Sequence, residues 1–202
     1  ELKKEFPNFS YGWAVPRADK WRDILFHTRE LLSYRRYLVV NKNRQSVYYK
    51  ERYVRYLSSM LRSLLKIPGV IYLLGTRLCG SILRGFEYLA PPFSLITDDI
   101  RAYAPDVLIA APVNLRFSSA DLEYLKSAKK MKIPTVLPVL SWDNLTTKSL
   151  IHVFPDRLLV WNDVQQEEAK EHQRFPQDRI RIAGAPVFDP WFSRLTPSQT
   201  RE

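Results

Sequence analysis

The chain has 202 residues, 46% of them hydrophobic and 13% aromatic, which is enough apolar material for one substantial core and excludes a disordered protein. Its single cysteine, Cys79, excludes an internal disulfide framework and favours a reducing compartment, and no stretch is apolar enough to span a bilayer. The net charge of +10 lies in residues 1–92, which hold 17 Lys and Arg against 7 Asp and Glu, whereas residues 93–202 hold 14 of each. We therefore predict a cytoplasmic protein, and any partner of its basic first part is expected to be acidic.

The basic first part, residues 1–92, is predicted to be a helical region appended to the main domain. Its apolar residues recur at helical spacing in two segments, with Arg and Lys between them on faces that we expect to be solvated. Pro68 and Gly69 break the second helix, and Pro91 and Pro92 close the region. The two apolar stripes are Trp21, Ile24, Leu25, Leu31 and Leu32, and Tyr53, Tyr56, Leu57, Met60, Leu61, Leu64 and Leu65.

Residues 93–192 alternate between helix and strand patterns, as in a parallel α/β sheet flanked by helices. Thr97 is predicted to cap a helix that Pro105 ends, Ser118 with Asp121 resembles the capping box of a second helix, and a third helix covers residues 163–172. Short β-branched runs of the kind that form buried parallel strands occupy residues 106–111, 135–140, 157–160 and 179–183. We predict a Rossmann-like core in which these four strands are parallel neighbours.

Polar and aromatic side chains follow three of the predicted strands at the point where each strand ends. The carboxyl ends of parallel strands lie at one edge of a sheet, where α/β proteins bind their ligands. We therefore predict a binding site at this edge. Its candidate residues are Ser141, Trp142, Asp143, Asn144, Thr146 and Lys148 after the second strand, Trp161 and Asn162 after the third, and Gly184 after the fourth.

The spacing of glycine, histidine and acidic residues argues against several common sites. Gly75, Gly80 and Gly85 lie five residues apart, which is neither a dinucleotide-binding fingerprint nor a phosphate-binding loop. The three histidines lack the spacing of metal ligands, and the chain has no Asp-x-Asp pair to hold a metal-bound sugar nucleotide. We expect neither a metal site nor a bound cofactor.

The string Ser-Trp-Asp-Asn-Leu-Thr-Thr-Lys at residues 141–148 is the most specific motif of the chain. Together with residues further on, it resembles a group of bacterial glycosyltransferase-like proteins of GT-B architecture. More distantly, the ending of the fourth strand resembles UDP-N-acetylglucosamine 2-epimerases and the glycerophosphotransferases of teichoic acid synthesis. The resemblance covers roughly residues 105–192. The further residues that carry it are Pro155, Asp156, Trp161, Asn162, Gln165, Glu168, Ala169, His172, Gly184, Ala185, Phe188 and Asp189.

This resemblance implies two Rossmann-like domains that face a cleft, the first binding the acceptor and the second binding the nucleotide sugar. Residues 93–192 would then be the core of the first domain, and residues 193–202 the start of the interdomain linker. The first strand with its loop and the whole donor domain would be absent, so the chain alone would be catalytically incomplete. Ser149 departs from the glycine that the group usually has at this position.

The loop after the second strand has structural interpretations beside the functional ones. Asp143 is either a general base for an acceptor hydroxyl or a cap of the following turn. Asn144 and Thr146 are either ligands or turn residues, and Lys148 either pairs with a phosphate or acidic acceptor or is solvated.

The same alternatives apply to the candidates after the third and fourth strands. Trp161, like Trp142, either stacks on a sugar ring or belongs to the core. Asn162 is most simply the N-cap of the helix that follows. Gly184 is explained by a positive φ or by close approach of the backbone to a ligand.

The leading hypothesis is a metal-independent glycosyltransferase that moves a sugar from a nucleotide sugar to a glycan or lipid-linked acceptor of the cell envelope. Positive charge builds on the sugar as its bond to the leaving phosphate breaks, and Asp143 would take the proton of the attacking hydroxyl. The alternatives of the same fold are a glycerophosphotransferase and a sugar-nucleotide epimerase. The epimerases that the chain resembles place acidic residues in the loop after Leu140, and no Glu occupies that loop here, which weakens the epimerase alternative.

Two further hypotheses concern the basic helices. Arg and Lys that flank Leu and Tyr on amphipathic helices favour an anionic membrane surface, and hence a peripheral position at the inner face of the membrane. A hypothesis of another class is a nucleic-acid-binding module, in which Arg and Tyr of residues 34–62 grip phosphates and stack on bases. Tyrosines that share an apolar stripe argue against the nucleic-acid hypothesis.

Overall fold

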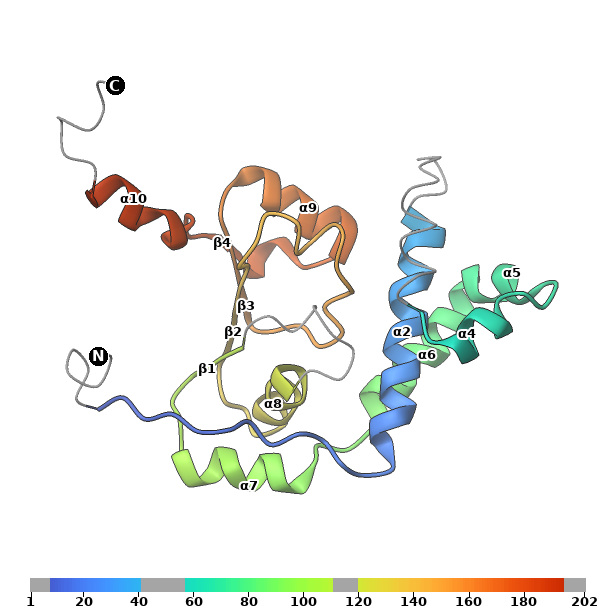
Figure 1. Cartoon of the computed structure of the whole chain (residues 1–202), viewed down its shortest axis with the longest axis horizontal. Helices are drawn as coiled ribbons and strands as arrows, with labels where there is room; N and C mark the ends of the chain where they lie inside the picture. Colours follow the sequence, from blue (N-terminus) through green and yellow to red (C-terminus); the bar gives the residue numbers. More distant parts are fainter. Residues whose placement is uncertain (1–7, 41–56, 111–119, 195–202) are drawn as a thin grey trace.

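The computed structural model describes residues 8–40, 57–110 and 120–194, and it contains one parallel sheet with helices beside it (Figure 1). The strands are β1 (Leu108–Ile109), β2 (Thr135–Pro138), β3 (Arg157–Val160) and β4 (Ile180–Ile182), in the order β1-β2-β3-β4. All three pairings are parallel, with Leu137 opposite Leu158 and Leu158 opposite Ile180. The predicted sheet is thus confirmed, except that residue 111 lies outside the described residues.

Helices α8 (Ala120–Lys130) and α9 (Asp163–Gln173) connect neighbouring strands and bury one face of the sheet. Leu122 and Leu125 of α8 and Ala169 of α9 pack on Leu137 and Leu158 in the main core. This arrangement follows from the sequence, because each helix presents its apolar stripe to strands whose alternate side chains face it.

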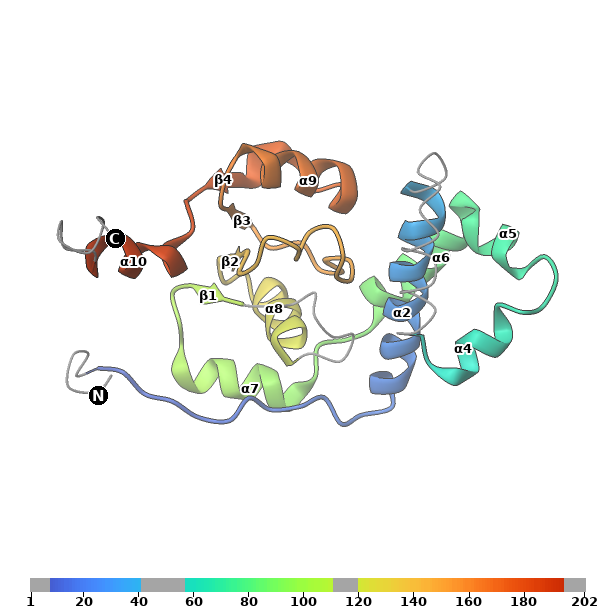
Figure 2. The ribbon, with the colours of Figure 1, turned by 45° about the horizontal axis from the view of Figure 1, so that its top comes forward.

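The opposite face of the sheet is largely open among the described residues. Ile109 is 66% exposed, and Val136 and Leu159 are only half-buried. Figures 1 and 2 both show α8 and α9 on the same side of the sheet as α2. Parallel sheets are normally covered on both faces, so this apolar face is a surface suited to a further covering element.

Four helices form a lobe next to α8 and α9, namely α2 (Trp21–Val40), α4 (Ser59–Leu64), α5 (Val70–Gly75) and α6 (Arg77–Leu89). Tyr34 and Tyr37 of α2 share a second core with Leu57, Leu61 and Leu74. The predicted break is confirmed, because Gly69 adopts a φ of 87° and precedes the first residue of α5. Within the described parts of the chain, no helix has both the length and the apolar character that a membrane crossing requires.

The prediction that the arginines of the basic part are solvated is wrong for three of the four arginines of α2. Arg29, Arg35 and Arg36 are buried, whereas Ile24 from the predicted apolar stripe is exposed. Helical periodicity shows which residues share a face, but it does not show that carboxylates and carbonyl groups from other elements meet the arginines. Tyr53 and Tyr56 lie outside the described residues.

The predicted cap of α7 (Ser94–Tyr103) is also wrong. The helix begins at Ser94 and its N-cap residue is Phe93, so Thr97 lies inside the helix. The Thr97 hydroxyl donates to the Phe93 carbonyl at 3.2 Å instead of accepting from a backbone N–H group. Ser118, the expected cap of α8, lies outside the described residues.

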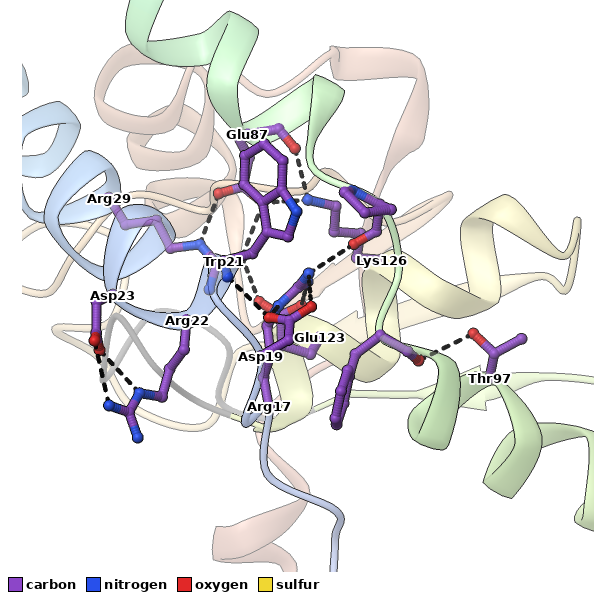
Figure 3. Close-up of polar contacts among 12 residues, drawn as sticks. Arg17, Asp19, Trp21, Arg22, Asp23, Arg29, Glu87, Thr97, Glu123 and Lys126 are labelled. Carbon is purple, nitrogen blue, oxygen red and sulfur yellow. Dashed lines mark hydrogen bonds and ion pairs between the residues drawn. The ribbon is translucent and has the colours of Figure 1, made fainter.

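A buried ion network joins the lobe to the sheet-covering helices (Figure 3). Arg29 of α2 makes two contacts with Glu87 of α6, at 2.7 and 2.8 Å, and a third with Glu123 of α8 at 2.6 Å. Arg17, from the segment before α2, meets the other oxygen of Glu123 at 2.8 Å. Three cations therefore balance three carboxylates. The members are Arg17, Asp19, Arg29, Glu87, Glu123 and Lys126.

The charge of Glu87 depends on these partners. Burial alone would raise the pKa of its carboxyl group, but the hydrogen bonds and charge of Arg29, with the charge of Lys126, lower the pKa to about 2. Removing one partner of such a network leaves a buried charge without compensation, which costs far more than losing a surface ion pair.

We expect Arg29→Met to lower the free energy of unfolding by about 3–5 kcal/mol, because Glu87 and Glu123 would keep their charges without their main partner. The control is Arg101→Met, which removes an exposed pair with Asp98 at 2.9 Å. Urea denaturation should place the control within about 0.5 kcal/mol of the wild type. Equal losses in the two variants would contradict the role assigned to the network.

Candidate functional site

The loop of residues 141–148 leaves the carboxyl end of β2 and holds Asp143 in a polar setting; we call it the carboxyl-edge loop. The Asp143 carboxylate accepts hydrogen bonds from the Ser141 and Thr147 hydroxyls, both at 2.9 Å, and lies 3.1 Å from the Lys148 ammonium group. Its side chain remains 16% exposed. Partial burial would raise the pKa of Asp143, but the hydrogen bonds from Ser141, Lys148 and Thr147 lower it. Asp143 is therefore ionised at neutral pH and partly exposed.

The shape of this loop is set by Asn144 and by α2. The buried Asn144 accepts hydrogen bonds through Oδ1 from the backbone N–H groups of Leu140 at 3.1 Å and Ser141 at 2.9 Å. Arg36 of α2 donates to the carbonyl groups of Leu145 and Thr146 at 3.2 Å, and also to that of Lys148. Asn144 is thus a turn residue, which was one of the two interpretations from the sequence. Arg36 fixes the loop to α2 through its backbone carbonyl groups.

The two tryptophans of the predicted site differ in their surroundings. Trp142 is 72% exposed, so its indole ring is accessible from solvent. Trp161 donates its indole N–H to the Val139 carbonyl at 2.7 Å and packs edge-on against Phe188 with ring centres 5.7 Å apart. Of the two, Trp142 is the more exposed, and Trp161 is half-buried.

The remaining candidates after β3 and β4 have mainly structural roles. Asn162 accepts a hydrogen bond from the Gln165 N–H at 3.0 Å and caps α9, as predicted. Gly184 has a φ of 78° and open space around it, so the positive φ accounts for glycine there. Gln165, which was not a candidate, connects two of the loops, since it bonds the Trp161 N–H at 2.8 Å and the Ser141 carbonyl at 3.4 Å.

The structure thus brings the candidate loops to one edge of the sheet, but only part of the set presents groups to a ligand. The accessible groups belong to Trp142, Asp143 and Lys148, with Ser141 and Thr146 beside them. Among the residues that the structure describes, no group of three or more His, Cys, Asp or Glu side chains is placed to hold a metal ion.

A second feature, which the sequence analysis did not predict, is a cavity of about 720 Å³ between α2 and α6 on one side and α8 and α9 on the other. We call it the basic cavity, because eight Arg and Lys side chains line it together with a single carboxylate, that of Glu87. His152 also lines it, with Nε2 3.3 Å from the Ser33 hydroxyl. Burial, with the positive charge of Arg29 adding to it, lowers the pKa of His152 to about 3, so the imidazole is neutral.

Acidification should therefore destabilise the protein through His152. The folded pKa of about 3 lies below the ordinary value of 6.5, so the unfolded state binds the proton first. Above pH 6.5, His152 is neutral in both states and does not lower the free energy of unfolding. As the pH falls from 6.5 towards 3, protonation of His152 in the unfolded state lowers that free energy progressively. The free energy of unfolding should fall between pH 7 and pH 5 in the wild type, and this fall should be about 1–2 kcal/mol smaller in His152→Gln. Urea denaturation of both proteins at both pH values measures it. Parallel losses in the two proteins would contradict this.

Comparisons of the chain with protein-family models, with curated protein sequences and with solved structures find no match. The function has to be inferred from the carboxyl-edge loop, the basic cavity and the residues that carry the glycosyltransferase resemblance.

Proposed function

We propose that the chain is the acceptor-side part of a nucleotide-sugar-dependent glycosyltransferase of GT-B architecture. The observation that carries the proposal is the accessible carboxylate of Asp143 next to the exposed indole of Trp142, at the carboxyl edge of a parallel sheet. A sugar ring offers an apolar face that stacks on an aromatic ring and hydroxyl groups that donate to a carboxylate, so the pair suits a sugar acceptor.

In the proposed reaction, Asp143 accepts a hydrogen bond from the attacking hydroxyl group. The bond between the anomeric carbon and the leaving phosphate oxygen breaks, the hydroxyl oxygen bonds to that carbon, and the hydroxyl proton passes to Asp143. Because hydrogen bonds lower the pKa of Asp143, the carboxylate is a weak base and takes the proton only after positive charge has developed on the sugar. Lys148 holds the carboxylate in place at 3.1 Å.

Two structural observations support the involvement of further polypeptide. The segment η3 (Pro186–Phe188) and α10 (Asp189–Arg194) leads away from the sheet, as Figure 1 shows, and it exposes Trp191 and Phe192. In the proposal, the nucleotide part of the donor is bound by a second domain on this side. The epimerase alternative is less favoured, because no glutamate occupies the loop after Leu140.

The nucleic-acid hypothesis draws less support from the described residues. Tyr34 and Tyr37 are buried in the core of the lobe, where they cannot stack on bases. Arg36 is engaged with backbone carbonyl groups of the carboxyl-edge loop. Aromatic platforms for single-stranded nucleic acid need exposed ring faces.

The proposal is tested by measuring nucleotide release from a panel of nucleotide sugars and sugar acceptors, with the chain joined to whatever its natural coding sequence encodes downstream. We expect Asp143→Asn to lower turnover by about 100-fold, because the amide cannot take the proton. Asp178→Asn, at an exposed carboxylate near the amino end of β4, should leave turnover unchanged. Turnover that persists in Asp143→Asn removes Asp143 from the mechanism.

We further propose that the enzyme works on an anionic membrane surface, where a lipid-linked acceptor would lie. Helices α4 to α6 expose many large apolar side chains, and residues 58–86 include four basic residues and no acidic one. A surface that is apolar and only positively charged complements an anionic bilayer. The apolar residues are Met60, Leu64, Ile67, Ile71, Tyr72, Leu73, Leu78, Ile82, Phe86 and Leu89, and the basic residues are Arg62, Lys66 and Arg77, since Arg84 lines the basic cavity instead.

Sedimentation with liposomes tests the membrane proposal. We expect binding to vesicles that contain phosphatidylglycerol, weaker binding at high salt, and none to phosphatidylcholine alone. The double change Tyr72→Ser with Leu73→Ser removes side chains that are 85% and 62% exposed, and it should abolish the binding. The matched control, Leu95→Ser with Tyr103→Ser on α7, should bind like the wild type. Equal recovery with both kinds of vesicle would reject the proposal.

A further inference from the structure

The basic cavity holds more positive charge than its surroundings neutralise. Lys126 is paired with Glu87, and Lys129 lies 2.7 Å from the Asp156 carboxylate. Arg35, Arg84, Arg174 and Arg179 also line the cavity, and no carboxylate of the described residues forms an ion pair with any of them. A concentration of unbalanced guanidinium groups is a site where an anion is stabilised.

Arg35 is the buried member of this group. It donates to the Thr76 carbonyl at 3.0 and 3.3 Å, and its guanidinium lies against Gly80 of α6, where a methyl group would come within 2.5 Å of Cζ. Burial lowers the pKa of Arg35, and the like charges of Arg84 and Arg174 lower it further. Arg35 of α2, Arg84 of α6 and Arg174 at the end of α9 thus place positive charge in the same cavity. Gly80 leaves the space that the Arg35 guanidinium occupies.

The cavity wall also has an apolar part. Leu32 and Val39 of α2 face a segment between β2 and β3 that contributes further apolar side chains, and the neutral His152 adds no charge. The volume of about 720 Å³ lies in the range of small-molecule pockets. The apolar residues of that segment are Leu150, Ile151, Val153 and Phe154.

From this geometry we infer that the basic cavity binds a phosphate ester that carries an apolar group, with the phosphate between Arg35, Arg84 and Arg174 and the apolar group against the wall formed by Leu32 and residues 150–154. A phosphate group offers several acceptor oxygens that match guanidinium donors and balances the repulsion among the arginines. The site is distinct from the carboxyl-edge loop, and the inference stands whether or not the chain transfers sugars.

Isothermal titration calorimetry with three soluble probes tests the ligand class. We expect octyl phosphate, kept below its micelle concentration, to bind at least about tenfold more tightly than inorganic phosphate, which lacks the apolar group, and than octyl glucoside, which lacks the charge. Octyl glucoside binding as tightly as octyl phosphate overturns the inference. Uridine monophosphate is a phosphate ester without an alkyl chain, so it distinguishes a nucleotide ligand from a lipid-like one. If it binds as tightly as octyl phosphate, the inference that the ligand carries an apolar group is overturned.

Matched variants locate the binding in this cavity. Arg84→Gln removes an exposed guanidinium at the rim and should weaken octyl phosphate binding about tenfold. Gly80→Ala should weaken it similarly, because the added methyl group displaces the Arg35 guanidinium. Gly85→Ala lies in the same helix with open space around it and should bind like the wild type. Thermal unfolding curves establish that the variants are folded. Unchanged affinity in both Arg84→Gln and Gly80→Ala overturns the inference.

Discussion

The contact of Arg29 with Glu87 and Glu123 is the interaction on which the arrangement of this protein depends. It joins three helices that belong to different parts of the chain, and it does so in a place where water cannot replace a lost partner. A buried ion pair contributes little net stability compared with apolar packing, but it tolerates no mismatch of position. The network therefore fixes where the lobe lies against the sheet-covering helices more than it increases the total stability.

Both candidate sites are consequences of this placement. Arg35 and Arg36 lie about two turns after Arg29 in α2. Arg35 lines the basic cavity, and Arg36 donates hydrogen bonds to the backbone of the carboxyl-edge loop. Neither contact is possible unless α2 is held at a fixed distance from the sheet. The same helix thus lines the basic cavity and holds the backbone of the carboxyl-edge loop, although the two regions differ in chemistry.

Local patterns in the sequence were sufficient for the sheet and for the helices that connect its strands. The N-cap Asn162 and the positive φ at Gly184 depend on nearby residues, and the alternation of strands with connecting helices indicates parallel strands, so these features could be predicted. The burial of Arg29 could not, because Glu87 and Glu123 lie 58 and 94 residues away along the chain. Likewise, the exposed Trp142 and the half-buried Trp161 have similar sequence settings, and only tertiary contacts separate them.

The shared carboxylates of the ion network have a consequence for how this sequence can change over time. Glu123 pairs with both Arg17 and Arg29, and Glu87 pairs with both Arg29 and Lys126, so replacing Arg29, Glu87 or Glu123 affects two partners at once. An apolar replacement becomes acceptable only when the opposing charges are removed as well. In descendants of this chain, Arg29, Glu87 and Glu123 are thus expected either to persist together or to be replaced together, which would mark the network in an alignment as a correlated set.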